Sequence, residues 1–265
     1  MIAAVTGKGG VGKTTVAALL LDEIARGGYQ GKVLVVDGDP ATTLHLALGL
    51  PDPRSTVADV RDKLDMRGKT LRNLPSGMSR EEYVLTTLRE GQIVQRHERR
   101  GMKFDFMAMG QGEGHGCYCA VNGALSAALK AIVSAYDIVL VDNEAGLEHL
   151  NRYRIAALDV MAIVEVPGRA ARAVTRRILD TVKSVDMAVS RMVLVENRSN
   201  GNGSSLDSVD GIDEVLQIPV SDDLERLDAE LSPSVELVDD SPVRQALAPV
   251  VAQLVAVGSL PVPAE

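Results

Sequence analysis

Residues 7–15 read GKGGVGKTT, and this stretch decides the fold of the chain. Its spacing, G-x-x-x-x-G-K-[ST], is the pattern of a phosphate-binding loop, or P-loop. Glycines let consecutive backbone N–H groups converge on phosphate oxygens, and the N-terminus of a following helix adds the positive end of its dipole. An apolar stretch of strand length, Ile2–Thr6, precedes the loop, and apolar residues at helical spacing follow it. The sequence therefore predicts a strand, a loop and a helix that together bind a nucleotide.

The loop residues have separate expected roles. Lys13 is expected to neutralise the β- and γ-phosphates, and the Thr14 hydroxyl is expected to ligate Mg²⁺. The residues predicted to surround the phosphates are Gly9, Gly10, Val11, Gly12, Lys13, Thr14 and Thr15. A Gly-rich turn without a ligand is the alternative, and the flanking strand and helix patterns argue against it.

A second lysine, Lys8, stands at the head of the loop, although Lys13 already serves one nucleotide within one chain. Residues 8–15, KGGVGKTT, resemble the deviant Walker A motif of the MinD/ParA/NifH group of ATPases. The resemblance implies hydrolysis of ATP to ADP and phosphate with Mg²⁺ as cofactor. It also implies that Lys8 reaches across a homodimer interface to the partner's ATP, so that ATP binding drives dimerisation. The alternative is a lysine that simply faces solvent.

Length and charge exclude several classes of protein. With 265 residues, the chain is long enough for one α/β domain over residues 1–265. Its net charge of −8 disfavours binding to nucleic acid, and 3% aromatic residues leave few platforms on which bases could stack. No apolar stretch approaches the ~18 residues of a transmembrane span, and Met1 leads directly into a strand pattern. We therefore expect a cytoplasmic protein that binds no membrane.

Apolar stretches of strand length alternate with helical patterns along the chain. The stretches are Ile2–Thr6, Lys32–Asp37, Phe104–Met109, Ile138–Asp142, Val160–Val166 and Met192–Glu196. Val174, Ile178, Val182 and Val185 are spaced to share one helix face. This alternation predicts an α/β fold with a mostly parallel central sheet and helices on both faces. Residues 50–103, which are charged and interrupted by prolines, are expected to add helices beside the nucleotide site.

Two acidic motifs follow predicted strands. Asp37 and Asp39 come at the carboxyl end of a strand, where open α/β sheets bind their ligands. Residues 138–142, IVLVD, match a Walker B strand, whose Asp142 would hold a Mg²⁺-bound water. In the MinD-like group, a D-x-D-P stretch is switch I, which implies that Asp39 positions the attacking water and that Asp37 lies near Mg²⁺. Without a P-loop nearby, each motif would be an ordinary turn or a polar strand end.

Shorter matches to the same group lie further along. Ala145 and Gly146 fit switch II, whose glycine N–H can sense the γ-phosphate. The segments after two later strands resemble those that surround the adenine. The residues implied there are Asn197, Arg198, Pro219 and Asp222.

Both cysteines of the chain, Cys117 and Cys119, lie in one Gly-rich segment. In an extended backbone, residues i and i+2 point to the same side, so the two thiolates can converge on one ion. Two thiolates do not complete a Zn²⁺ or Ni²⁺ site, and a two-fold dimer would supply two more. His115 and His149 are further possible ligands. The alternative is a pair of small buried side chains without a metal.

The deviant Walker A motif, the C-x-C motif and residues 142–150, DNEAGLEHL, together resemble the CooC-type ATPases that mature nickel carbon monoxide dehydrogenase. The resemblance implies a Ni²⁺ or Zn²⁺ site at the dimer interface and a client metalloenzyme, with ATP hydrolysis supporting nickel insertion. It does not account for His115.

Related ATPases with other functions remain as alternatives. A MinD-like positioning protein should carry a basic amphipathic C-terminal helix. Here the segment after Pro242 is apolar and has Arg244 as its sole cation. A ParA-like partition protein needs a basic surface for DNA, for which the candidates are Arg169, Arg172, Arg176 and Arg177. An iron–sulfur carrier of the NifH type would also use interface cysteines, but with a different spacing.

Overall fold

The protein is described by a computed structural model over residues 1–66, 77–111, 119–143, 157–185, 187–200 and 210–258. For residues 65–66, 119–124 and 257–258, the description covers the backbone alone. Within this part of the chain, a sheet of eight strands has the order β3-β4-β2-β5-β1-β6-β7-β8. The strands are β1 (Ile2–Gly7), β2 (Val33–Asp37), β3 (Val94–Arg99), β4 (Met102–Ala108), β5 (Ile138–Asp142), β6 (Ala157–Glu165), β7 (Ala188–Ser199) and β8 (Glu214–Pro219). All neighbouring pairs are parallel except β3 and β4, which form an antiparallel hairpin.

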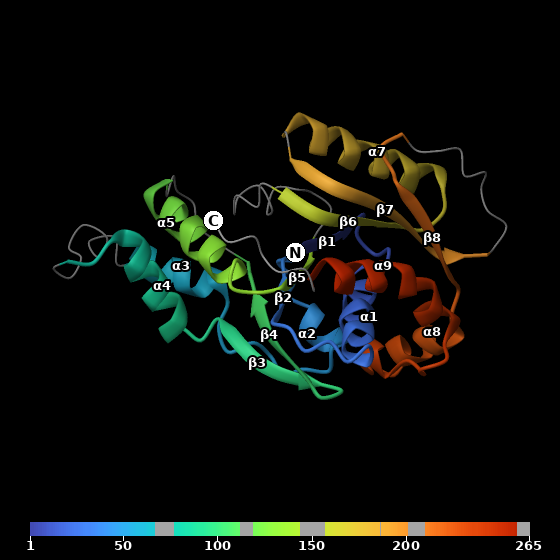
Figure 1. The fold of residues 1–265 in the computed structure, drawn as a ribbon, viewed down its shortest axis with the longest axis horizontal. Helices are drawn as coiled ribbons and strands as arrows, with labels where there is room; N and C mark the ends of the chain where they lie inside the picture. Colours follow the sequence, from blue (N-terminus) through green and yellow to red (C-terminus); the bar gives the residue numbers. More distant parts are fainter. Residues whose placement is uncertain (67–76, 112–118, 144–156, 186, 201–209, 259–265) are drawn as a thin grey trace.

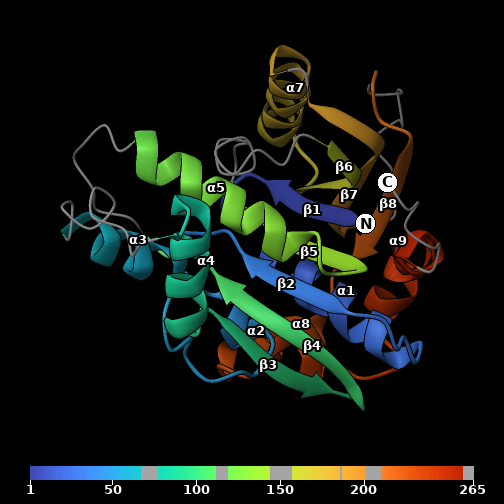
Figure 2. The same ribbon diagram turned by 60° about the vertical axis from the view of Figure 1, so that its left-hand side comes forward.

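Helices cover both faces of this sheet, as Figures 1 and 2 show. One face packs against α1 (Lys13–Arg26), α2 (Leu44–Ala47), α8 (Asp222–Ala229), the short 3₁₀ helix η1 (Ser234–Glu236) and α9 (Pro242–Gly258). The other face packs against α3 (Val57–Met66), α4 (Arg80–Glu90), α5 (Cys119–Val133) and α7 (Arg169–Ser184). The predicted α/β fold with a mostly parallel sheet is confirmed.

The central strands are apolar up to their carboxyl ends because both of their faces are covered. In β2, Val33 and Val35 enter the core on the α1 side, whereas Leu34 and Val36 enter the core on the α5 side. The same alternation holds in β1 and β5. Continuous apolar strands of this kind are typical of parallel sheets with helices on both faces. Their burial fixes the register in which the carboxyl ends meet at one edge of the sheet.

The six predicted strands are all present, with ends that differ by up to four residues. The prediction of helices for residues 50–103 was right for α3 and α4 and wrong for Val94–Arg99, which forms β3. This strand reads VQRHER and lies at the edge of the sheet, where its pairing with β4 outweighs its polar composition. On α7, Val182 is buried, but Val185 lies just beyond the helix end and is 36% exposed.

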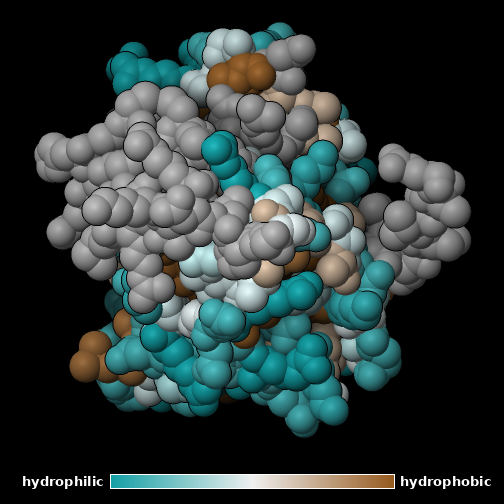
Figure 3. Space-filling view, turned by 90° about the vertical axis from the view of Figure 1, so that its left-hand side faces the viewer, coloured by the Kyte–Doolittle hydropathy of each residue, from teal (hydrophilic) through white to brown (hydrophobic). Residues whose placement is uncertain are grey.

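None of the described helices is long and apolar enough to cross a bilayer. Figure 3 views the side of the molecule on which α3 and α4 lie in Figure 1, and the coloured surface there is mostly hydrophilic with scattered apolar patches.

Candidate nucleotide-binding site

The P-loop connects the carboxyl end of β1 to the first residue of α1. Gly12 caps α1 in a left-handed conformation, with φ of 94°, and its carbonyl accepts a hydrogen bond from Val16 N at 3.0 Å. Lys13 is 7% exposed, and its Nζ donates to the Lys8 carbonyl at 3.2 Å. The Lys13 ammonium is thereby held over the loop, where it can meet a phosphate. Lys8 itself is exposed, and its reach into a partner subunit stays a prediction.

Two glycines of the loop lie against neighbouring strands and leave no space for a side chain. A Cβ added to Gly7 would collide with the Val164 carbonyl of β6. A Cβ added to Gly12 would lie 2.5 Å from Nδ2 of Asn197 in β7. The same Nδ2 donates to the Val11 carbonyl at 2.8 Å. The loop is therefore held from the side by β6 and β7, and its backbone can approach phosphate oxygens closely.

Thr14 and Asp142 meet beside the loop, as a Mg²⁺ site requires. Thr14 Oγ1 donates to Asp142 Oδ2 at 2.7 Å. Asp142 is 1% exposed, and its Oδ1 has no hydrogen-bond partner within the described chain. Burial raises the pKa of Asp142 to about 6, although the Thr14 hydroxyl and the Lys13 charge act in the opposite direction. A buried carboxylate oxygen without a partner, next to a threonine hydroxyl, fits a hydrated Mg²⁺.

Asp37 lies opposite Asp142 in the register of β2 and β5. Its Oδ1 accepts from Asp39 N at 3.1 Å, and its Oδ2 accepts from Leu44 N at 2.9 Å. Burial raises the pKa of Asp37 to about 7; the Leu44 N–H lowers it, and the charge of Asp142 raises it further. Asp37 thus organises the turn that leads into α2. Asp37 and Asp142 are therefore two neighbouring buried carboxyls with raised pKa values. A divalent cation bound to their oxygens would stabilise their ionised forms.

Asp39 lies in that turn and is partly buried. Its Oδ1 accepts from Ala41 N at 2.8 Å, and its carbonyl accepts from Thr42 N at 2.9 Å. The charge of Asp39 contributes to the raised pKa values of both Asp37 and Asp142. The three carboxylates therefore belong to one site. The role of Asp39 in positioning water stays a prediction.

The residues predicted for the adenine side lie at the carboxyl ends of β7 and β8. Asn197 is the one whose side chain contacts the P-loop. Arg198 is exposed and has φ of 57°, and its backbone N donates to Asn197 Oδ1 at 3.0 Å. Pro219 pairs with Ser199 in the sheet, and the exposed Asp222 begins α8. They share the edge of the sheet that carries the P-loop, and their contacts with adenine stay a prediction.

The sequence analysis missed a buried ionic cluster at the same edge. Arg172 Nη2 lies 2.7 Å from Glu196 Oε1 and 3.1 Å from Glu165 Oε1. Thr175 Oγ1 donates to Glu165 Oε2 at 2.5 Å, and Gln217 Nε2 donates to Glu196 Oε2 at 3.1 Å. The two glutamates are at most 2% exposed. The available signal was a glutamate directly after an apolar run, which occurs as VMAIVE in β6 and as MVLVE in β7.

The cluster fixes the backbone next to Asn197 and changes the interpretation of one arginine. Because Arg172 is engaged with two buried carboxylates, it is not available as a surface cation for DNA. Arg169, Arg176 and Arg177 of the same helix are exposed.

The predicted metal site falls mostly outside the described residues. Cys117, His115, Gly146 and His149 lie outside them. Cys119 is the first residue of α5, and its side chain is not described. The C-x-C metal site and switch II therefore stay predictions.

The sequence is similar to a known family of domains and to individual proteins of that kind. A family model described as an AAA domain matches residues 1–194. An ATP-binding protein of Methanocaldococcus jannaschii is 32% identical over 198 residues, which cover 75% of this chain and 74% of that protein. The carbon monoxide dehydrogenase accessory protein CooC of Rhodospirillum rubrum is 27% identical over 231 residues, which cover 85% of this chain and 86% of CooC.

Solved structures agree on the fold. The septum site-determining protein MinD of Pyrococcus horikoshii, complexed with Mg-ADP, superposes with a TM-score of 0.60 at 22% identity. The superposition covers 97% of this chain and 93% of that chain. At this identity, the likeness shows the arrangement of helices and strands and not the biological role.

Proposed function

This chain belongs to the AAA domain family of MinD-, ParA- and CooC-like P-loop ATPases, and we propose that it is a Mg²⁺-dependent ATPase that acts as a homodimer. One observation carries the proposal: Thr14 donates to the buried Asp142 at 2.7 Å beside a P-loop that is headed by the exposed Lys8. The proposal is supported because a phosphate-binding loop, residues suited to Mg²⁺ and an exposed lysine lie in one place.

Each residue of the site has a defined task in this reaction. Lys13 and the loop N–H groups hold the β- and γ-phosphates, and Asp39 orients the attacking water. Thr14 would hold Mg²⁺ directly, and Asp142 and Asp37 would hold it through its waters; when bound, the ion neutralises charge on the phosphate oxygens. Lys8 of the partner subunit would add the remaining positive charge, in the way that an arginine finger does.

The finer part of the proposal is that the dimer delivers nickel to a metalloenzyme such as carbon monoxide dehydrogenase. Its support is the C-x-C pair, Cys117 and Cys119, together with the similarity to CooC over most of both chains. Four thiolates from two subunits would bind one Ni²⁺ or Zn²⁺, which are ions that accept soft ligands. ATP-driven dimerisation would then couple nucleotide state to metal affinity by linkage.

Titration with Ni²⁺ tests the metal site. Wild type should bind one ion per dimer, and the Cys117→Ser/Cys119→Ser variant should lose this uptake while it retains ATP binding. Uptake should weaken below neutral pH because thiolate ligation displaces protons. Equal uptake by both proteins, or one ion per monomer, would contradict the intersubunit site. The visible absorption spectrum of the purified protein distinguishes an iron–sulfur carrier of the NifH type from a Zn²⁺-binding dimer, because an iron–sulfur cluster absorbs visible light and Zn²⁺ does not.

A second candidate is a partition ATPase of the ParA type. The observation in its favour is the row of exposed cations on α7, namely Arg169, Arg176 and Arg177. Three arginines on one helix are a small footprint in a chain with a net charge of −8. Retention of the ATP-bound protein on duplex DNA at physiological salt, lost on substitution of these arginines, would favour this candidate over metal delivery.

A further inference from the structure

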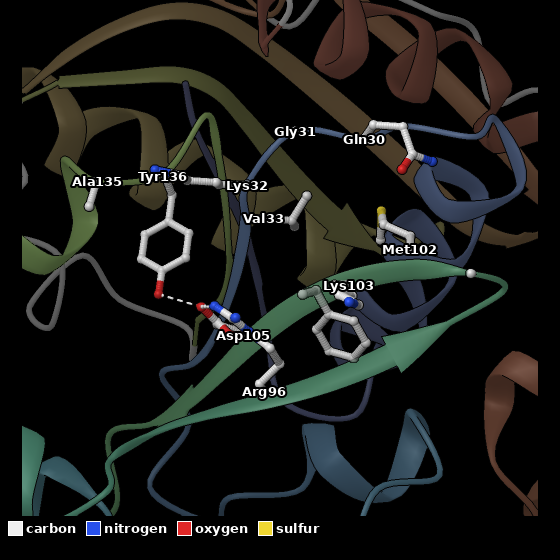
Figure 4. Close-up of a pocket in the computed structure, with 12 residues that line it drawn as sticks. Gln30, Gly31, Lys32, Val33, Arg96, Met102, Lys103, Asp105, Ala135 and Tyr136 are labelled. Carbon is white, nitrogen blue, oxygen red and sulfur yellow. Dashed lines mark hydrogen bonds and ion pairs between the residues drawn. The ribbon is translucent and has the colours of Figure 1, made fainter.

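A hollow of about 720 Å³ opens at the end of the sheet opposite the P-loop (Figure 4). Lys32 and Val33 line it at the start of β2, whereas Asp37 of the nucleotide site ends the same strand. A strand of this length separates its two ends by about 13 Å. The hollow is therefore distinct from the nucleotide site.

The charges that line this hollow are mostly positive. Lys32, Arg96 and Lys103 contribute three cations, and Asp105 is the single carboxylate in the lining. Arg96 binds Asp105 through Nε at 3.0 Å and Nη2 at 3.3 Å, and Tyr136 Oη donates to the same carboxylate at 2.8 Å. Figure 4 shows Arg96 and Tyr136 converging on Asp105. Asp105 is thus fully occupied.

The two lysines remain available for a ligand. Neither Lys32 nor Lys103 forms an ion pair with a carboxylate in the described part of the chain, although Glu98 stands opposite Lys103 in the β3–β4 register. Both lysines are exposed. In a chain with a net charge of −8, this local excess of cations favours a negatively charged ligand.

The walls of the hollow are fixed by contacts outside it. The Lys32 backbone N donates to Asp137 Oδ2 at 2.7 Å, and the Lys32 carbonyl accepts from Ile138 N at 3.1 Å. At the tip of the β3–β4 hairpin, Arg100 pairs with Asp22 at 3.0 Å and with Asp239 at 2.7 Å. A ligand therefore meets a preformed surface and orders little more than the lysine side chains, which lowers the entropic cost of binding.

A second hollow of about 340 Å³ adjoins the first and is mainly apolar. It lies between α4 and α5, and its lining includes Leu85, Leu88 and Ile132. Ala135 and Tyr136 line both hollows, so the two form one groove with a cationic half and an apolar half.

We propose that this groove binds an acidic segment of a partner protein that also carries large apolar side chains. Carboxylates of the segment would pair with Lys32 and Lys103, and its apolar side chains would enter the hollow between α4 and α5. A small anion would use the cationic half alone and leave the adjoining apolar half without an occupant. A protein segment matches both halves.

Selection from a library of short random peptides on the full-length protein tests this proposal. We expect enrichment of sequences that combine glutamate or aspartate with leucine, isoleucine or phenylalanine. The Lys32→Glu/Lys103→Glu variant should weaken binding of a labelled selected peptide by about tenfold or more, because attraction becomes repulsion. Ala131→Gln, at an exposed α5 position in the apolar half, should weaken it comparably by filling the hollow without adding a charge.

The matched control is Lys63→Glu/Lys183→Glu, which makes the same change in charge at exposed positions of α3 and α7 that line neither hollow. It should leave peptide affinity unchanged, and ATP binding should be retained in every variant. Absence of enriched peptides, enrichment of peptides without acidic residues, or equal affinity for wild type and the lysine variant would overturn the proposal. Displacement of the peptide by citrate together with indifference to Ala131→Gln would identify a small-anion site instead and would also overturn it.

Discussion

At the scale of single residues, the buried carboxyls of Asp37 and Asp142 determine how the site responds to pH. They face each other on neighbouring strands, and burial raises their pKa values to about 7 and about 6. Both carboxyls therefore bind protons more strongly in the folded, metal-free protein than in the unfolded chain. As the pH rises from about 4 to about 7, this difference lowers the free energy of unfolding of the metal-free protein. In the proposed site, Mg²⁺ with nucleotide would offset this loss of stability by neutralising the negative charge of the two carboxylates.

The first prediction is that binding of Mg²⁺ with ATP releases protons near neutral pH. At about pH 6.5, between the pKa values of about 6 for Asp142 and about 7 for Asp37, part of the carboxyl population must lose its proton before the ion binds. The apparent affinity for Mg²⁺ should therefore fall as pH decreases below about 7. Calorimetry in two buffers of different ionisation enthalpy measures the proton release, and Asp142→Asn should reduce it. Release that is independent of pH and of Asp142 would contradict this assignment.

The P-loop and the Walker B strand were predictable from sequence because each is a short motif with a fixed spacing. The contact between Asn197 and the Val11 carbonyl was not predictable, because it joins residues 186 positions apart. Sequence similarity suggested that Asn197 lies near adenine, and the structure adds that it supports the loop. The cluster around Arg172 was not predicted for the same reason, since its members come from four elements, namely β6, α7, β7 and β8.

At the scale of elements, burial on both faces explains which strands the sequence reveals. β2 and β5 are each four apolar residues followed by an aspartate, and they were predicted almost to the residue. β3 is polar, lies at the sheet edge and depends on β4 for its hydrogen bonds, so local composition does not reveal it. The C-terminal helix α9 looked like an apolar helix with one cation, Arg244. That arginine proves to be 1% exposed.

The second prediction concerns this buried arginine, which ties α9 to α1. Arg244 Nη1 lies 2.7 Å from Asp22 and 2.6 Å from Glu23, and its Nη2 donates to the Leu237 carbonyl at 2.8 Å. Arg244→Ala should lower the free energy of unfolding by about 3 kcal/mol, because it leaves buried acceptors without a donor. This loss of free energy lies at the lower end of the range for breaking a buried ion pair, because Arg99 still binds Asp22 at 2.5 Å after the substitution.

Denaturant unfolding followed by circular dichroism measures this loss. The matched control is Arg226→Ala on α8, whose side chain is 56% exposed and pairs with Asp223 at 3.3 Å. Its effect should stay below about 1 kcal/mol, as is usual for exposed ion pairs. Equal effects of the two substitutions would show that Arg244 does not hold α9 in place.

At the scale of the whole molecule, the sheet separates two kinds of surface. The carboxyl ends of β1, β2 and β5 gather the P-loop, Thr14 and the acidic side chains, whereas the opposite end carries the groove around Tyr136. Nucleotide chemistry and partner docking can therefore occur on one subunit at the same time. The sequence predicted the first surface from motifs. It could not predict the second, which is formed by residues from the start of β2, from β3 and β4, from α4, and from the end of α5 and the segment after it.

The central claim is that each ATP site is completed by Lys8 of the partner subunit, and mixing two inactive variants tests it most directly. Lys8→Ala lacks the lysine that is donated, and Asp39→Ala lacks the residue that positions water, so each alone should be nearly inactive. In a heterodimer, the site with intact Asp39 receives Lys8 from the Asp39→Ala subunit. An equal mixture should therefore regain about a quarter of the wild-type ATPase rate, since half of the dimers are mixed and each has one complete site. A mixture no more active than the separate variants would contradict the account, and so would a Lys8→Ala protein that hydrolyses ATP at the wild-type rate.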